Sequence, residues 1–202
     1  MPLRIGVLDG RPVIGTVVGV GPAAASRSVR RLLDATEVDH VVVIGVCGGI
    51  DPALGIGDLV VPTDVADETG HSLVPAPLVG LEPRGRLLTT STLVMDAERH
   101  EAWRADGIVA VDMETAAVGA VCEARGVTWS VVRAVSDRPS DGLFDASIME
   151  LLRPDGSPDL RAVARRVVRH PRSIATLARL GRDSSRAAKA SVAGAVDAVA
   201  RS

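Results

Sequence analysis

The chain has 202 residues with 23 basic and 25 acidic side chains, a formal net charge of −2, and only two Trp, one Phe and no Tyr. Its length and its 47% hydrophobic content fit one globular domain, 1–202, with a full core. The scarcity of aromatic side chains argues against a protein that stacks single-stranded nucleic acid, and the sequence has neither a long uncharged apolar run nor a signal-peptide pattern at its start.

The first half of the sequence predicts a hairpin, a helix and a buried strand. Residues 4–10 and 11–20 alternate around an Asp-Gly turn, which is a strong hairpin signal. Residues 22–35 begin with a proline at a first helical position and are typical of a helix. The β-branched run 40–45 indicates a strand that is buried on both faces.

The second half continues the alternation of strands and helices. Strands are predicted at 57–67, 84–94, 108–112 and 128–137, and helices near 96–104 and at 113–125. From residue 159 the pattern is helical, with breaks expected at Pro171 and Gly181. This order predicts an α/β fold of three layers around a mostly parallel sheet, with 159–202 as a basic helical extension.

Polar stretches follow three of the predicted strands. They are GVCGGID at 45–51, DME at 112–114 and SDRPSDG at 136–142. In folds of this class, ligands bind at the carboxyl ends of the strands. If the three strands are neighbours, these loops line one cleft.

Two glycine-rich segments are candidate ligand sites. Residues 19–25, GVGPAAA, loosely match a dinucleotide fingerprint, but the following strand does not end in an acid and Pro22 lacks the N–H that a phosphate would use. NAD binding is therefore disfavoured. The adjacent Gly48 and Gly49 would let a ligand lie against the backbone, although a tight turn explains them equally well.

The acids of the DME stretch have two interpretations. Asp112 as an N-cap and Glu114 in the first helical turn would both be stabilised by the helix dipole. Capping does not account for Met113. A carboxylate in a cleft can also accept hydrogen bonds from the two vicinal hydroxyls of a ribose, and a thioether can pack on the sugar.

Ser136 and Asp137 come at the end of a buried strand. A partly desolvated aspartate there could act as a proton donor, whereas the alternative is an ordinary Ser-Asp turn. The two cysteines, Cys47 and Cys122, are interpreted as reduced buried thiols of a cytoplasmic protein. The four histidines have no metal-ligand spacing, so no metal is expected.

Taken in order, residues 19–25, 41–62, 110–127 and 131–137 resemble the purine nucleoside phosphorylase and nucleosidase superfamily, which includes the methylthioadenosine/S-adenosylhomocysteine nucleosidases. The resemblance implies a central mixed sheet flanked by helices. It also implies cleavage of the N-glycosidic bond of a purine nucleoside by water or phosphate, without a cofactor. Members form closed oligomers, so a homo-oligomer, most simply a dimer, is expected.

The resemblance also implies roles for individual residues. Glu114 would hold the ribose 2′- and 3′-hydroxyls and Met113 would pack on the sugar, while Asp112 caps the helix. Asp137 would protonate the departing base with support from Ser136. The residues that would border the ribose and base are Cys47, Gly48, Gly49 and Phe144.

The C-terminal portion is similar to the hopanoid-associated nucleoside phosphorylase branch, whose members remove adenine from a lipid-linked nucleoside, adenosylhopane. Residues 1–150 carry 12 basic and 21 acidic side chains, net −9, whereas 151–202 carry 11 and 4, net +7. The resemblance gives the basic residues a role in peripheral contact with an anionic membrane; the alternative is a solvated helix face. The arginines concerned are Arg161, Arg165, Arg166, Arg169 and Arg172.

The sequence departs from the family pattern at the residues that handle the second substrate. No glutamate precedes Glu37, although hydrolytic members use an early Glu to activate water. The positions that hold phosphate in phosphorolytic members correspond to Val43 and Val46. Phosphate as co-substrate therefore stays open, and the alternative function is a purine-nucleoside-binding protein without catalysis.

Overall fold

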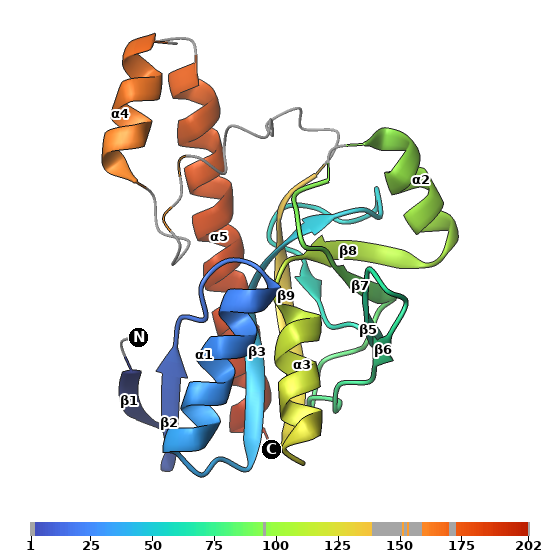
Figure 1. Ribbon diagram of the computed structural model, residues 1–202, viewed down its shortest axis with the longest axis vertical. Helices are drawn as coiled ribbons and strands as arrows, with labels where there is room; N and C mark the ends of the chain where they lie inside the picture. The colour runs from blue at the N-terminus through green and yellow to red at the C-terminus, as the bar shows by residue number, and fades with distance from the viewer. Residues whose placement is uncertain are drawn as a thin grey trace.

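The computed structural model describes residues 3–94, 96–138, 151, 153, 159–169 and 173–201. Its centre is a seven-stranded mixed sheet with the strand order β4-β9-β3-β8-β7-β5-β6, and Figure 1 shows helices on either side of it. The pairs β9–β3, β8–β7 and β7–β5 are parallel and the other three are antiparallel. The strands are β3 (His40–Gly49), β4 (Leu59–Val60), β5 (Asp64–Asp67), β6 (Ser72–Leu73), β7 (Arg86–Thr89), β8 (Ile108–Asp112) and β9 (Thr128–Asp137).

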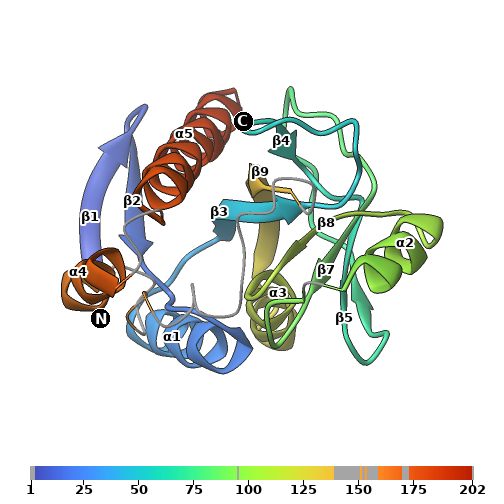
Figure 2. The same ribbon diagram turned by 90° about the horizontal axis from the view of Figure 1, so that it is seen from above.

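Helices cover both faces of this sheet, which confirms the predicted three-layer α/β class (Figure 2). The helices α1 (Pro22–Ala35) and α3 (Thr115–Ala124) share a core with Val131 and Val135 of β9. The long helix α5 (Ser173–Ala200) packs on Val132, which points to the opposite face because side chains alternate along a strand. The shorter helices are α2 (Ala97–Ala105) beside β8 and α4 (Leu160–Arg169) beside α5.

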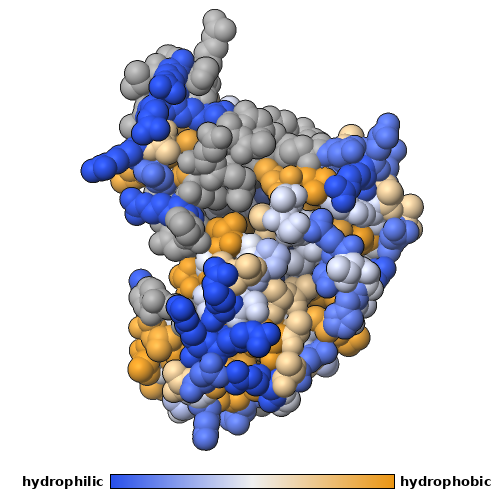
Figure 3. Space-filling view, viewed as in Figure 1, coloured by the Kyte–Doolittle hydropathy of each residue, from blue (hydrophilic) through white to orange (hydrophobic). Residues whose placement is uncertain are grey.

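The predicted hairpin is confirmed and forms a separate two-stranded sheet of β1 (Leu3–Leu8) and β2 (Arg11–Thr16). Asp9 and Gly10 both have positive φ, 47° and 78°, as the tight Asp-Gly turn requires. Leu3, Ile5 and Val7 lie on one exposed face of β1. Figure 3 shows hydrophobic surface at the lower left, where Figure 1 places the hairpin.

The helix predicted at 22–35 matches α1, whereas other predicted boundaries were wrong, among them those of the strand expected at 84–94, which is only Arg86–Thr89. The strand expected at 40–45 continues to Gly49, because β8 pairs with its last residues. The strand expected at 57–67 is divided into β4 and β5 around Pro62, which has no N–H to donate to a ladder. The helix break expected at Gly181 is absent: α5 continues through it, since one glycine weakens a helix by only about 1 kcal/mol.

None of the helices within the described residues is long and apolar enough to span a membrane.

Candidate active site

Gly48 lies at the point where the predicted site segments meet. Strand β3 lies between β9 and β8, and Gly48 pairs with Asp137 on one side and with Val111 on the other. Because β8 is antiparallel to β3, its carboxyl end lies beside Cys47, next to the terminal residues of β3 and β9. The three strands are therefore neighbours, which is the condition on which the predicted cleft depended.

Gly48 and Gly49 belong to β3 and do not form the predicted loop. A Cβ at Gly48 would lie 3.2 Å from Oδ2 of Asp137, and one at Gly49 would lie 3.0 Å from Cγ1 of Val135. Neither glycine has a positive φ. The two glycines thus allow close packing of neighbouring side chains, and the turn interpretation was wrong.

The centre of the site is an ion pair that the sequence analysis missed. Arg133 of β9 is 5% exposed, and its Nη2 donates to Oδ2 of Asp112 at 2.5 Å. Its Nε and Nη2 also donate to Oγ1 of Thr115, at 3.0 and 2.8 Å. Thr115 Oγ1 in turn donates to Asp112 Oδ2, and Thr89 Oγ1 donates to Asp112 Oδ1 at 2.6 Å. The Asp112 carboxylate is therefore fully paired, although almost no water reaches it.

Gly45 makes room for the Arg133 side chain. The two residues are register partners on β3 and β9, and a Cβ at Gly45 would lie 2.3 Å from Nη1 of Arg133. Only glycine lets the guanidinium cross β3 toward Asp112. The available signal in the sequence was a single arginine within the apolar run VVRAV, because a cation in a buried strand requires an acid partner.

Asp112 therefore has a larger role than the predicted cap. Helix α3 begins at Thr115, and Glu114 occupies the N-cap position without a side-chain capping bond. The expectation that Glu114 lies in the first helical turn was wrong. Asp112, two residues before the N-cap, accepts from the backbone N–H of Thr115 at 3.1 Å, so it caps the helix and balances Arg133 at the same time.

Glu114 points toward the glycine-rich segment 19–25. Its Oε1 accepts from the backbone N–H of Gly21 at 2.9 Å, and its Oε2 lies 3.6 Å from Nη2 of Arg133. Burial raises the pKa of Glu114 above its ordinary value, and the nearby charge of Asp112 adds to this, while Arg133 and the Gly21 N–H act in the opposite direction. The N–H of Gly21 is thus used by a carboxylate of the same chain, which agrees with the rejection of a dinucleotide site.

Ser136 and Asp137 form a second pair at the end of β9. Ser136 is buried, and its Oγ donates to Oδ1 of Asp137 at 2.6 Å and lies 3.3 Å from the carbonyl oxygen of Cys47. Oδ2 of Asp137 is the oxygen next to Gly48. Both cysteines are free and buried, as predicted, and burial raises the pKa of the Cys47 thiol.

The remaining predicted residues are placed less centrally. Met113 is half-buried between Asp112 and Glu114, and Phe144 lies outside the described residues. Two further acids, Asp67 at the end of β5 and Glu68 after it, accept bonds from their own surroundings: Asp67 from Thr69 and His71, and Glu68 from Ser91. Within the described ranges, no three His, Cys, Asp or Glu side chains are grouped so that they could hold a metal ion.

Comparison with known proteins identifies relatives of this chain. The chain is 32% identical over 164 residues, 66% of its length and 71% of the relative's, to a 5′-methylthioadenosine/S-adenosylhomocysteine nucleosidase of a Marinomonas species. It is 27% identical to a nucleosidase of the same name from Colwellia psychrerythraea, solved with adenine, at a TM-score of 0.60 over 67% of this chain and 69% of that one.

A third relative confirms the fold over nearly the whole chain. The nucleosidase from Neisseria meningitidis, solved with methylthio-immucillin-A, superposes at a TM-score of 0.73 over 99% of this chain and 86% of its own, at 18% identity. The family model described as the phosphorylase superfamily matches residues 1–84 and 82–169. With most of its length covered by that model, the chain belongs to the phosphorylase superfamily.

Proposed function

We propose that the chain is a purine nucleosidase that hydrolyses the N-glycosidic bond of an adenine nucleoside and releases the free base. The observation that carries this proposal is that the two strands flanking Gly48 each lead to an acid: Asp137 of β9 is the register partner of Gly48, and Glu114 comes two residues after the end of β8. The named relatives are nucleosidases that act on adenine nucleosides, which supports the same reaction class.

Glu114 is suited to hold the ribose. Its Oε1 is fixed by Gly21, while its Oε2 is beyond hydrogen-bond distance of Arg133. A carboxylate fixed in this way can accept hydrogen bonds from vicinal hydroxyls without first losing side-chain freedom. Such bonds strengthen as the sugar becomes oxocarbenium-like, so they favour the transition state.

Asp137 is suited to protonate the leaving base. Ser136 fixes one of its oxygens and leaves Oδ2 beside the unsubstituted Gly48. In the proposed reaction the bond from C1′ to the base nitrogen breaks as Asp137 gives its proton to the base. Water adds its hydroxyl to C1′, and its remaining proton restores Asp137.

Hydrolysis is favoured over phosphorolysis by the charges around Arg133. This guanidinium faces both Asp112 and Glu114, at 2.5 and 3.6 Å, so its charge is already balanced. A phosphate anion near it would meet two carboxylates, which disfavours binding. The positions equivalent to the family's phosphate-binding residues are Val43 and Val46, whose side chains carry no charge.

A more specific proposal concerns the group that the nucleoside carries at its 5′ position. We propose a 5′-substituted or lipid-linked adenosine, such as adenosylhopane, cleaved by a cytoplasmic homo-oligomer that contacts the membrane through its basic C-terminal helices. The proposal is supported by Arg161, Arg165 and Arg169 of α4, which are exposed, whereas Arg166 is half-buried and Arg172 lies outside the described residues. Figure 3 shows hydrophilic residues gathered over this helix. A solvated helix face is the competing explanation.

The role of Asp137 is tested by Asp137→Asn. Because the asparagine amide cannot deliver the proton, adenine release should fall by about 10²- to 10⁴-fold. The release is measured by chromatography with methylthioadenosine and adenosine as substrates. Asp67→Asn, at the last residue of β5, is the matched control and should retain the wild-type rate. If Asp137→Asn also retains that rate, Asp137 is not the acid and the proposed mechanism is wrong.

A further inference from the structure

A cavity on helix α5, outside the nucleoside site, is lined by cations. Its volume is about 610 Å³, and its lining residues are Ala178, Gly181, Arg182, Ser185, Arg186 and Lys189. These residues recur at three- and four-residue intervals, so they follow one side of the helix. The fully buried residues Ala187, Ser191 and Ala195 mark the side that packs on the sheet, and the cavity is therefore on the outward side.

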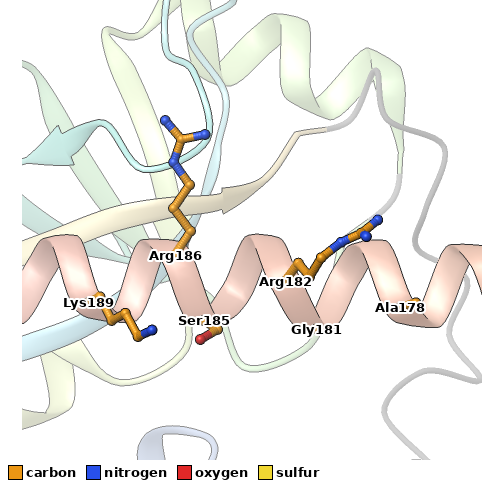
Figure 4. Close-up of a pocket in the computed structure, with 6 residues that line it drawn as sticks. All are labelled: Ala178, Gly181, Arg182, Ser185, Arg186 and Lys189. Carbon is orange, nitrogen blue, oxygen red and sulfur yellow. The ribbon is translucent and has the colours of Figure 1, made fainter.

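Two of these cations are available to a ligand. Figure 4 shows Ser185 and Lys189 at one edge of this face of α5, and Arg186 extending from its opposite edge. Arg186 lies against a loop, where a Cβ at Gly57 would be 3.2 Å from its Nε. Arg182 and Lys189 are exposed and, within the part of the chain that the structure describes, neither forms an ion pair.

The nearest acid on the helix does not neutralise this surface. Asp183 is 3.5 Å from Nε of Arg179, one turn earlier on the helix. The cavity is therefore lined by a hydroxyl and by two cations that form no ion pair with any described residue, and its lining residues include no carboxylate. The positive charges of Arg182 and Lys189 can therefore attract an external anion, because no residue that the structure describes forms an ion pair with them.

We propose that this cavity binds the phosphate groups of a ligand. Arg182 can donate two parallel hydrogen bonds to one phosphate, Lys189 supplies a point charge, and Ser185 supplies a hydroxyl between them. Arg182 and Lys189 are seven residues apart, which is about 10 Å along the helix axis. Two long side chains at this separation can both reach a diphosphate more readily than a single phosphate. The site is on the face of the sheet opposite α3, and the proposal does not depend on the nucleosidase activity.

The phosphate could belong to a free metabolite or to a lipid headgroup. Val192 and Val196 continue the outward face of α5 and are 50% and 37% exposed, which gives an apolar neighbour to the cations. A free diphosphate would contact only the cations, whereas an anionic phospholipid would contact the cations with its headgroup and the two valines with its apolar part. Two probes therefore distinguish these sources: inorganic pyrophosphate, and vesicles containing phosphatidylglycerol compared with pure phosphatidylcholine.

The experiment measures the dissociation constant of each probe for the full chain and for Arg182→Gln/Lys189→Gln. Loss of two charge-assisted contacts should weaken binding about 100-fold or more. Arg179→Gln, on the same helix but outside the cavity, should bind like wild type. All changed side chains are exposed, so the ligand-free unfolding temperatures should agree and show that the variants fold.

Each outcome decides the proposal. Pyrophosphate binding that the double variant loses supports the site with a free ligand as its source. Binding only to phosphatidylglycerol vesicles, lost in the same variant, supports the site with a headgroup as its source. Binding of neither probe to wild type, or binding that the double variant keeps, overturns it.

Discussion

Replacing Arg133 by methionine is expected to lower the free energy of unfolding by about 3–5 kcal/mol, because the variant leaves the buried carboxylate of Asp112 without its counter-charge. The Asp112 side chain is 1% exposed and that of Arg133 is 7% exposed, so water cannot replace the lost partner. Thr89 and Thr115 would still donate to the carboxylate, but neutral hydroxyls do not balance its charge. Urea denaturation at neutral pH measures the change.

Arg125→Met is the matched control for this prediction. Arg125 binds Asp34 at 2.6 Å, a distance close to the 2.5 Å of the buried pair, but its side chain is 39% exposed and that of Asp34 is 59% exposed. Exposed pairs contribute about 0–1 kcal/mol, so the control should be nearly as stable as wild type. Adding Asp112→Asn to Arg133→Met should recover part of the loss, since it removes the unpaired charge. Equal, small losses at both arginines would contradict the central role of the buried pair.

Replacing Glu114 by glutamine is expected to have opposite effects on function and on stability. The ribose loses a charged acceptor for two hydroxyls, and bonds to a charged group contribute about 1.5–3 kcal/mol each. We therefore expect kcat/KM for adenine release to fall by at least about 100-fold, measured with methylthioadenosine. The backbone N–H of Gly21 can still donate to the amide oxygen of the glutamine, so the glycine-rich segment 19–25 should stay in place.

The stability effect follows from the direction of the Glu114 pKa. Burial raises this pKa in the folded state, so the wild-type stability is greatest when the group is protonated and decreases as the pH rises through the folded pKa. Glutamine stays neutral at every pH. The variant should therefore be more stable than wild type at neutral pH, with a difference that disappears below about pH 4, under the ordinary pKa of a glutamate. A variant that is less stable at pH 7 than wild type would show that the Glu114 charge is favourably paired.

Local signals were sufficient for the elements that depend on local chemistry. The Asp9-Gly10 turn predicts the hairpin because both residues need positive φ, and Pro22 marks the first residue of α1. The alternation of strands and helices gave the fold class. These features depend on residues close in the sequence, so they can be predicted from one amino-acid sequence without a structure.

The parts of the site that depend on pairing across the sheet could not be predicted in this way. The contact between Gly45 and Arg133 joins residues of two strands, and the bond from Gly21 to Glu114 joins segments 93 residues apart. The acids Asp112 and Glu114 were identified, but their different roles follow from which of them faces Arg133 at hydrogen-bond distance. The extension of β3 to Gly49 depends on its antiparallel partner β8, whose direction the sequence pattern does not define.

The central claim, that this chain hydrolyses an adenine nucleoside, is tested most directly by chromatography of its products from methylthioadenosine and adenosine, with and without phosphate. We expect free adenine together with the free sugar, at the same rate in both buffers, because the balanced charge of Arg133 leaves no use for a phosphate anion. Adenine formed only when phosphate is present, or no adenine from either nucleoside in either buffer, would contradict the proposed function.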